Sequence, residues 1–487
     1  MLLLLLLAAV AGAVRVPAAG RSSSSSSSAA GSGLRAQYFS NAVLLEPACT
    51  TIASTPAALH LDAAGLGEIC GGKLSPELFS VRMHGQLHLP LGEYQLKTQT
   101  SGALRFWVHG WKLVDEFMVP SGGARETIGK YNFTVVQNAT YPVRIDALFT
   151  SLPATIQVFY RRVGTAEWNA LGPTALSPTI DPNEQKRQDL QRALSRGWNT
   201  WHRASATAHV HLPSAFGFDI TIQDPARNLS FSKGIVDRCL AVPGADGISC
   251  HVRPHAHTFN GSFTYFDQTV RKDLKVAVKS AHTMDGNGTV VCLFADDAGG
   301  GSGEAVAQLQ VHATARYYFD CAPRTDSGEV NCGTITTDSD AKGLRARPVG
   351  LPAMSLRALG TAVAADAGGQ SLTMRMTDGV ACLVATPVGT PPHGAPSTLA
   401  ASASIISVAE QAVEAEVAAR YPREKVGASR DVVDALRSVM GWNTMYDHRA
   451  TVITPVSRSF GSQPFEMWLW DTYFSTLLAA ESSKELA

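Results

Sequence analysis

The chain has 487 residues, of which 45% are hydrophobic and 17% are charged, and its 41 basic and 41 acidic residues balance to a formal net charge of zero. This length allows two or three domains, each with its own core. The neutral balance gives no reason to expect nucleic acid or an acidic membrane surface as a partner.

The first residues, MLLLLLLAAVAGAV, form a short apolar run followed by small residues. Such a run is too short to span a bilayer comfortably and is typical of a signal peptide, here expected to occupy residues 1–18. An uncleaved anchor is the alternative, because the run is preceded only by the initiator amine. Residues 19–33, which contain RSSSSSSSAAGSG, are expected to form a flexible linker. No later stretch is apolar and uncharged for long enough to predict a further membrane span.

Two features agree with secretion, outside the cell or into the secretory-pathway lumen. Potential N-glycosylation triplets occur at Asn132, Asn138, Asn228, Asn260 and Asn287. The eight cysteines are expected to form disulfides: Cys49 with Cys70, Cys239 with Cys250 and Cys321 with Cys332, which leaves Cys292 and Cys382. Spacing alone does not fix this connectivity, but no CxxC or Cys/His spacing indicates a metal site.

Residues 34–165 contain short segments of alternating apolar and polar residues, separated by Gly and Pro, which predict a β-sandwich. The segments LRAQYF, FSVRMHGQL, GEY, LRFWVHGWKLVDEF, YPVRIDAL and IQVFY resemble, in this order, a protective-antigen (PA-14) domain. Such domains often accompany glycosidases and adhesins and bind carbohydrate. The resemblance therefore implies an oligosaccharide or another glycan as partner.

One departure from that family concerns calcium. Sugar-binding adhesin members carry an Asp-Asp-Gly that ligates calcium at the place where this chain has Ser101, Gly102 and Ala103. Calcium needs hard oxygen ligands such as carboxylates. The loss of both carboxylates predicts that the domain holds no calcium ion there, and no cofactor is expected elsewhere.

The middle of the chain predicts a second sandwich. A short charged helix is expected from Glu184 to Arg196, and strand-like segments then continue to about residue 392, so that residues 184–400 form one domain. Residues 401–428 are expected to be a linker region. Its Ala-rich stretch, Ser402 to Tyr421, favours a helix that the Tyr421-Pro422 pair ends.

The last segment, residues 441–478, reads GWNTMYDHRATVITPVSRSFGSQPFEMWLWDTYFSTLL. It resembles the entry into the helical toroid of glycosidases related to glycoside hydrolase family 63, the processing α-glucosidases and mannosylglycerate-hydrolase-like enzymes. The resemblance implies an inverting enzyme that acts on α-glucosidic or α-mannosidic linkages. The fold class expected is mainly β: two β-sandwiches followed, at residues 429–487, by the first helices of an incomplete (α/α)6 toroid.

The candidate sugar-binding residues come from the same segment. The resemblance implies that the Trp470-Asp471 pair lines the pocket, where the indole stacks on a pyranose and the carboxylate accepts hydrogen bonds from its hydroxyls. Arg458 and Tyr446 are the next candidates, at the pocket rim and wall. The alternatives are that Trp470 and Tyr446 are core residues and that Arg458 forms a surface ion pair with Asp447.

The last segment is too short to form a complete helical toroid. Twelve helices of average size need roughly 140 helical residues, whereas Ser429 to Ala487 comprise 59 residues. We therefore expect the catalytic acid and base to lie beyond Ala487 and the chain as given to be catalytically incomplete. The alternative is a non-catalytic carbohydrate-binding or cell-surface adhesion protein. Nothing in the sequence indicates the oligomeric state.

Two further patterns have competing explanations. The tetrapeptide Gly-Trp-Asn-Thr occurs at Gly197 and again at Gly441; it reflects either shared turn chemistry or two segments that together form the junction between sandwich and toroid. His209 and His211, like His255 and His257, alternate along strand-like segments. No carboxylate is spaced to complete a metal site with them, so we expect no metal.

Overall fold

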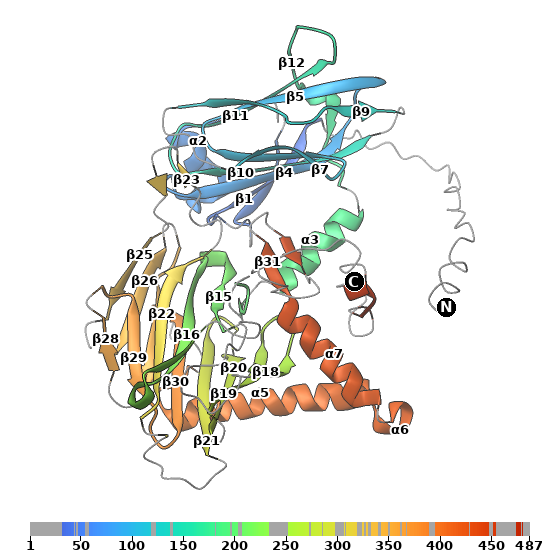
Figure 1. Cartoon of the computed structure of the whole chain (residues 1–487). Helices are drawn as coiled ribbons and strands as arrows, with labels where there is room; N and C mark the ends of the chain where they lie inside the picture. The colour runs from blue at the N-terminus through green and yellow to red at the C-terminus, as the bar shows by residue number, and fades with distance from the viewer. Residues whose placement is uncertain are drawn as a thin grey trace. The chain divides into compact units, whose positions relative to one another are not determined.

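The computed structural model describes residues 32–42, 44, 47–53, 58–117, 123–136, 140–180, 182–194, 197–202, 207–232, 252–271, 274–284, 286–297, 306, 308–318, 324–325, 328–329, 333–338, 342–348, 351–360, 363–366, 368–388, 395–427, 429–447, 451–453, 474–478 and 480. Most of these residues lie in antiparallel sheets (Figure 1), which confirms the predicted mainly β class.

The first sandwich consists of two sheets. Sheet I has the strand order β2-β1-β4-β10-β6-β7, with β13 paired to β4, and sheet II has the order β12-β11-β5-β8, with β3 paired to β11 and β9 to β5. The strands are β1 Leu34–Phe39, β2 Cys49–Ala53, β3 Ala58–Leu61, β4 Phe79–Leu87, β5 Gly92–Thr100, β6 Ala103–Val108, β7 Trp111–Glu116, β8 Arg125–Ile128, β9 Phe133–Val135, β10 Tyr141–Phe149, β11 Ala154–Arg162, β12 Asn169–Ala170 and β13 Leu176–Ser177.

The alternation of apolar and polar residues in the sequence determines which side chains of these strands face the core and which face outward. In β5, Tyr94 and Leu96 are buried in the core between the sheets, while the residues between them lie on the outer side. The β6–β7 hairpin turns through His109 and Gly110, which have φ angles of 50° and 79°. Two consecutive left-handed residues make the tight turn whose twist matches paired strands, and glycine adopts this conformation without strain. After residue 165, β12 and β13 continue the pairing with β11 and β4.

The second sandwich also has two sheets. Sheet III has the order β14-β15-β16-β22-β29-β28, with β17 paired to β16, and sheet IV has the order β18-β19-β20-β21-β30-β27-β26-β25. The strands are β14 Trp198–Asn199, β15 His209–His211, β16 Phe216–Asp224, β17 Leu229–Ser232, β18 Val252–His257, β19 Phe263–Arg271, β20 Leu274–His282, β21 Thr289–Asp297, β22 Gln310–Tyr317, β25 Gly333–Thr337, β26 Gly343–Pro348, β27 Met354–Leu359, β28 Val363–Ala365, β29 Ser371–Arg375 and β30 Val380–Pro387.

The remaining elements are short hairpins and helices. The hairpins pair β23 Arg324–Thr325 with β24 Gly328–Glu329 and β31 Met445–Asp447 with β32 Thr451–Ile453. The α-helices are α2 Ala63–Glu68, α3 Pro182–Leu194, α5 Leu399–Arg420, α6 Arg423–Val426 and α7 Ser429–Asn443, and the 3-10 helices are η1 Ile69–Gly72, η2 Pro173–Ala175, η3 Leu212–Ser214 and η4 Pro225–Arg227. Within the described part of the chain, no helix has the length and apolar character needed to cross a membrane.

Helix α5 packs on the outer face of sheet IV (Figure 1), where Ile406 joins a buried cluster with Phe263 and Val290. The helix begins where Thr398 accepts a hydrogen bond from the Ala401 amide at 3.2 Å, an N-cap. Its last residue is Arg420 and Tyr421 is its C-cap, so the helix stops at the Tyr421-Pro422 pair as the sequence predicted.

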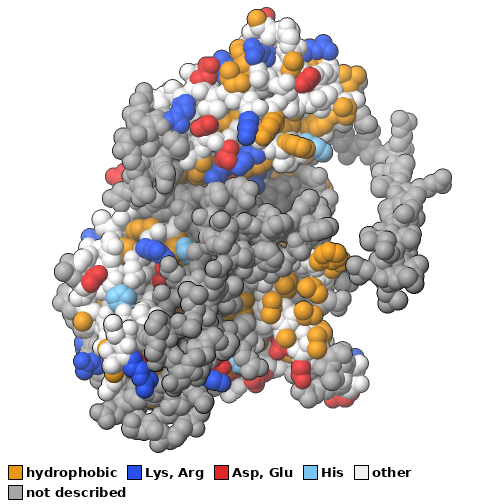
Figure 2. Space-filling view, viewed as in Figure 1, with side chains coloured by type: hydrophobic (Ala, Val, Ile, Leu, Met, Phe, Trp, Pro, Cys, Tyr) orange, Lys and Arg blue, Asp and Glu red, His pale blue; other side chains and the backbone are white. Residues whose placement is uncertain are grey.

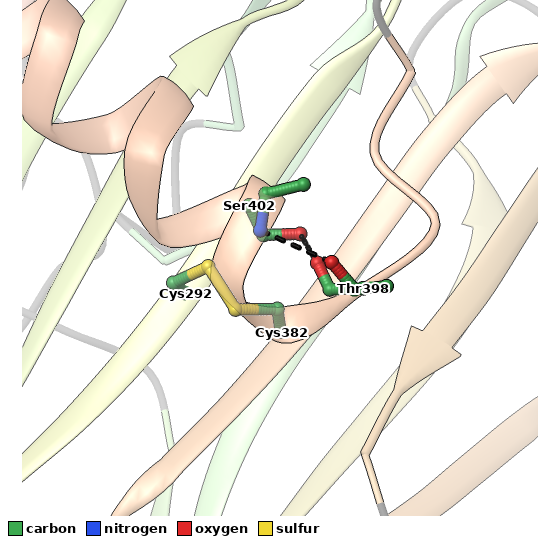
Figure 3. The surroundings of a disulfide bond; sticks show 5 residues. Cys292, Cys382, Thr398 and Ser402 are labelled. Carbon is green, nitrogen blue, oxygen red and sulfur yellow. Dashed lines mark hydrogen bonds between the residues drawn. A yellow bond between two sulfur atoms is a disulfide. The ribbon is translucent and has the colours of Figure 1, made fainter.

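Two disulfides lie among the described residues: one joins the predicted pair Cys49 and Cys70, and the other joins the two cysteines that the proposed pairing left over, Cys292 and Cys382. Cys49–Cys70 is in the first sandwich, and Cys292–Cys382 joins β21 to β30 beneath the start of α5 (Figure 3). Cys292 and Cys382 stand directly opposite each other in the strand register, and both are fully buried. The other proposed pairs, Cys239–Cys250 and Cys321–Cys332, lie outside the described residues.

Candidate functional site

The loop between β5 and β6 contains Ser101 and Gly102 and leads into Ala103, where the sequence resemblance predicts that calcium ligands are missing. The Ser101 hydroxyl donates to the carbonyl of Pro153 and accepts from the amide of Thr155, each at 2.9 Å. A Cβ on Gly102 would lie 2.3 Å from the Leu148 carbonyl oxygen, so this position admits no side chain. The loop is therefore tied to its neighbour by Ser101, and neither residue offers a carboxylate to calcium.

A row of four charged side chains, with Gln37 at its end, crosses the face of sheet I that points away from sheet II; we call it the charged row. In the strand register, Gln37, Arg82, Asp146, Arg105 and Asp115 stand opposite one another on β1, β4, β10, β6 and β7. Opposite charges in directly facing positions stabilise strand pairing. This charged row therefore contributes to the order of the sheet, and all of its members except Asp115 are buried.

Asp146 lies at the centre of the charged row and is fully buried. Arg82 donates to its two carboxylate oxygens at 2.8 and 3.0 Å, and Arg144, two residues away on the same strand, donates to both as well. Burial alone would raise the pKa of Asp146, but the charges and hydrogen bonds of Arg144 and Arg82 outweigh it and hold the pKa well below its ordinary value. Asp146 is thus an ionised structural residue.

The outer face of sheet II is open to solvent and combines aromatic, amide and charged side chains. Lys97 on β5 places its Nζ 4.9 Å from the ring centroid of Phe159 on β11 and 5.1 Å from that of Trp168. This cluster was not predicted from the sequence. Its signal is the polar and aromatic set at alternate positions of GEYQLKTQT and ATIQVFYRR, but only the register of β5 with β11 brings the two sets together.

The residues proposed for a sugar pocket are mostly outside the part of the chain that the structure describes. Trp470, Asp471 and Arg458 belong to this group. The backbone of Tyr446 lies in β31, where it pairs with Val452 of β32. The pocket that the resemblance implies therefore stays a prediction.

Both Gly-Trp-Asn-Thr segments are described, and the structure brings them together at one histidine. From the first segment, the Thr200 hydroxyl lies 3.0 Å from Nε2 of His257 on β18. From the second, the ring centroid of Trp442 lies 4.8 Å from that of His257. A Cβ on Gly441 would lie 2.6 Å from the His257 carbonyl oxygen, so this contact of α7 with β18 requires glycine.

The first of these segments also fixes two turns of sheet IV. The Trp198 indole donates to the Asn287 carbonyl at 3.1 Å, and the Asn199 side-chain amide donates to the Phe259 carbonyl at 2.9 Å. Trp198 and Trp442 both belong to the core of the second sandwich. The first copy of the tetrapeptide therefore connects the turns of sheet IV to this core, and the second copy connects α7 to it.

The histidines proposed as alternating pairs have separate surroundings. His255 is hydrogen-bonded through Nε2 to Asp267 at 2.6 Å, whereas His257 contacts Thr200. His209 Nδ1 lies 3.1 Å from the Thr207 carbonyl oxygen, and the ring stacks on Phe218. Among the described residues, no three His, Cys, Asp or Glu side chains are grouped as a metal ion would need.

Burial sets the protonation of the histidines around β15. Burial, together with the nearby His282, lowers the pKa of His209 and of His211 to about 4, although the Thr207 carbonyl partly opposes this at His209. Folding thus favours the neutral rings. Because an unfolded histidine takes up its proton near pH 6.5, stability is fully present above that pH and is lost as the pH falls towards about 4.

We therefore expect His209→Gln to reduce the loss of stability between about pH 7.5 and about pH 5 by about 2 kcal/mol. Glutamine retains a hydrogen-bond donor but takes up no proton, so one source of the pH dependence disappears. The measurement is urea unfolding of the wild type and the variant at both pH values. His60→Gln is the matched control, because His60 is exposed, and an equal effect of both substitutions would contradict the assignment.

The potential glycosylation sites are on the surface wherever the structure describes them. Asn132, Asn228, Asn260 and Asn287 are all exposed, and Asn138 lies outside the described residues. Asn260 and Asn287 belong to the two turns of sheet IV that Trp198 and Asn199 hold. Exposure is a requirement for modification, and glycosylation itself stays a prediction.

No protein-family model matches the chain, and no curated protein matches it. Solved structures that match part of it include the PA14 domain of the MpAFP antifreeze protein, with 15% identity, a TM-score of 0.27 and coverage of 33% of this chain and 98% of that one. Another is the PA14 sugar-binding domain from an RTX adhesin, with 19% identity, a TM-score of 0.25 and coverage of 30% and 99%. A third is β-glucosidase from Kluyveromyces marxianus in complex with glucose, with 20% identity, a TM-score of 0.22 and coverage of 34% of this chain but 17% of the enzyme.

Proposed function

We propose that the chain is a secreted carbohydrate-active protein whose first sandwich, residues 34–177, binds a glycan without calcium. The observation that carries this proposal is the pairing of the segments that resemble a PA-14 domain. They form β1, β4, β10, β6 and β7, which are consecutive neighbours in sheet I, and β5 and β11, which are neighbours in sheet II. The resemblance is therefore supported by segments that build one shared core.

Secretion is supported by the two disulfides and by the exposed glycosylation triplets. Disulfides persist in oxidising compartments and are rare in the cytosol. Four of the five Asn-x-Ser/Thr asparagines are described and exposed, so each is accessible to the transferase of the secretory lumen. These observations concern the compartment and are independent of the ligand.

Glycan binding by the full chain is expected to be unchanged when calcium is removed. The β5–β6 loop is held by hydrogen bonds of Ser101 and has no room for a side chain at Gly102, so no bound calcium ion is needed to shape it. The measurement is a glycan array in excess EDTA, followed by titration calorimetry of the strongest ligand with and without EDTA. A signal that EDTA abolishes and calcium restores would contradict the proposal.

A second candidate function is that the second sandwich and α7 belong to a glycosidase related to glycoside hydrolase family 63, with the first sandwich as its carbohydrate-binding module. The observation that favours it is the joint at His257, where both Gly-Trp-Asn-Thr segments meet, because the resemblance places a sandwich directly before the helical toroid. Analysis of the array ligands after incubation tests the enzyme. Hydrolysis products would establish it, and because the resemblance implies a catalytic acid and base beyond Ala487, binding without products is the result expected of the chain as given under both candidates.

A further inference from the structure

We infer that the outer face of sheet II is the glycan-binding surface of the first sandwich and that its ligand is a neutral oligosaccharide; this inference rests on the function proposed above. The face is built by β5 and β11, whose alternate residues point away from the core. Its members are Gln95, Lys97, Gln99, Gln157, Phe159 and Arg161, all of them partly or fully exposed.

An aromatic cluster lies near one edge of this face. Phe159 stands directly opposite Lys97 in the strand register. Trp168, from the loop that leads into β12, lies over the same face, because the Arg161 guanidinium carbon is 4.5 Å from its ring centroid and Lys97 Nζ is 5.1 Å away. The two partly exposed rings offer apolar surface to the C–H groups of a sugar.

The polar groups around the rings are held in fixed orientations. Arg161 donates through Nη2 to Gln95 Oε1 at 2.7 Å, and Lys97 donates to Glu126 Oε2 at 3.1 Å. Groups that are ordered before binding lose less conformational entropy when a ligand arrives. Donors and acceptors beside aromatic rings match a pyranose, which carries hydroxyls around its rim and C–H groups on its faces.

The charges of the face indicate a neutral ligand. Lys97 and Arg161 are balanced by Glu126, which accepts a hydrogen bond from Lys97, and by Glu93, whose Oε1 accepts a hydrogen bond from the Asn132 side-chain amide at 2.9 Å. With two cations and two carboxylates, the face has no excess charge that would attract a sulfated or uronic-acid polymer. Figure 2 shows basic, acidic and hydrophobic side chains interspersed over the side of this sandwich that faces the viewer.

The test is titration calorimetry of the full chain with maltotriose and mannotriose as neutral probes and with trigalacturonate as the acidic probe. Enzymatic removal of N-glycans precedes it, because Asn132 lies beside Glu93. We expect Trp168→Ala to weaken neutral-probe binding by about tenfold and Trp168→Phe to retain most of it. Trp111→Ala is the matched control, since Trp111 is 70% exposed and stands on sheet I. We expect it to bind as the wild type does.

The outcomes separate the inference from the function on which it rests. If the wild type binds a neutral probe and Trp168→Ala binds equally well, or Trp111→Ala loses binding instead, this surface assignment is wrong while glycan binding stands. Stronger binding of trigalacturonate than of both neutral probes would overturn the choice of ligand. If no glycan on the array binds the wild type, the proposed function itself fails. Unchanged thermal unfolding of the variants shows that altered binding does not come from misfolding.

Discussion

Removal of the Cys292–Cys382 disulfide by Cys292→Ala with Cys382→Ala is expected to destabilise the second sandwich by about 4–5 kcal/mol. The two cysteines are 90 residues apart in the sequence, so the bond closes a long loop in the unfolded chain. In the folded protein they face each other on β21 and β30, which are already paired by the sheet. The bond therefore acts mainly by restricting the unfolded state.

The Cys49–Cys70 disulfide provides a matched control in the first sandwich. Its cysteines are separated by only 21 residues, so its removal is expected to cost about 3 kcal/mol. Urea unfolding read by hydrogen exchange and mass spectrometry follows the two sandwiches through separate peptides. Each double variant should affect the sandwich that contains it. Equal losses for both disulfides, or a larger loss for Cys49–Cys70, would contradict the loop-length argument.

Replacement of Asp146 by asparagine is expected to destabilise the first sandwich by about 3–5 kcal/mol. The side chain of Asp146 is 0% exposed, and Arg82 is only 5% exposed. Asparagine cannot balance the charge of Arg82 and Arg144, so two guanidinium groups would be left in a poorly hydrated site without their shared carboxylate. Urea unfolding of the variant measures the loss.

Two further variants test whether the effect comes from the uncompensated charge. Glu116→Gln removes the acidic partner of Arg125 at 3.6 Å, a pair with 40% and 24% of its side chains exposed. Such a surface pair contributes about 1 kcal/mol or less. Arg144→Gln combined with Asp146→Asn should recover part of the loss, because one of the two cations is then removed. A loss no larger than that of Glu116→Gln would show that the charge of Asp146 is dispensable.

The sequence predicted those features that depend on local pattern. Period-two alternation identified the segments of the first sandwich, and the Ala-rich run before Tyr421-Pro422 identified α5. Cys292 and Cys382, which form a disulfide, were the two cysteines left over once the others had been paired with near neighbours in the sequence. These signals are local. Each arises because a short stretch of chain pairs its own backbone hydrogen-bonding groups and buries the apolar side chains of one face.

The features that were missed depend on register and on contacts between distant segments. Trp168 meets Lys97 only because β11 pairs with β5 in one particular register. His257 serves both Gly-Trp-Asn-Thr segments, and its own neighbourhood in the sequence gives no sign of this. Trp470, Asp471 and Arg458 remain predictions, because they lie outside the described residues.

The joint at His257 has a consequence for the order of events during synthesis. All strands of the first sandwich have been made once Ser177 is made, so this domain can begin to fold while most of the chain is still being translated. The second sandwich has to wait, because Trp442 fills part of its core against Phe266 and His257. The contact between Trp442 and His257 therefore forms only once α7 has been made. During that interval the half-built sheets are open to wrong pairing with other strands of the chain.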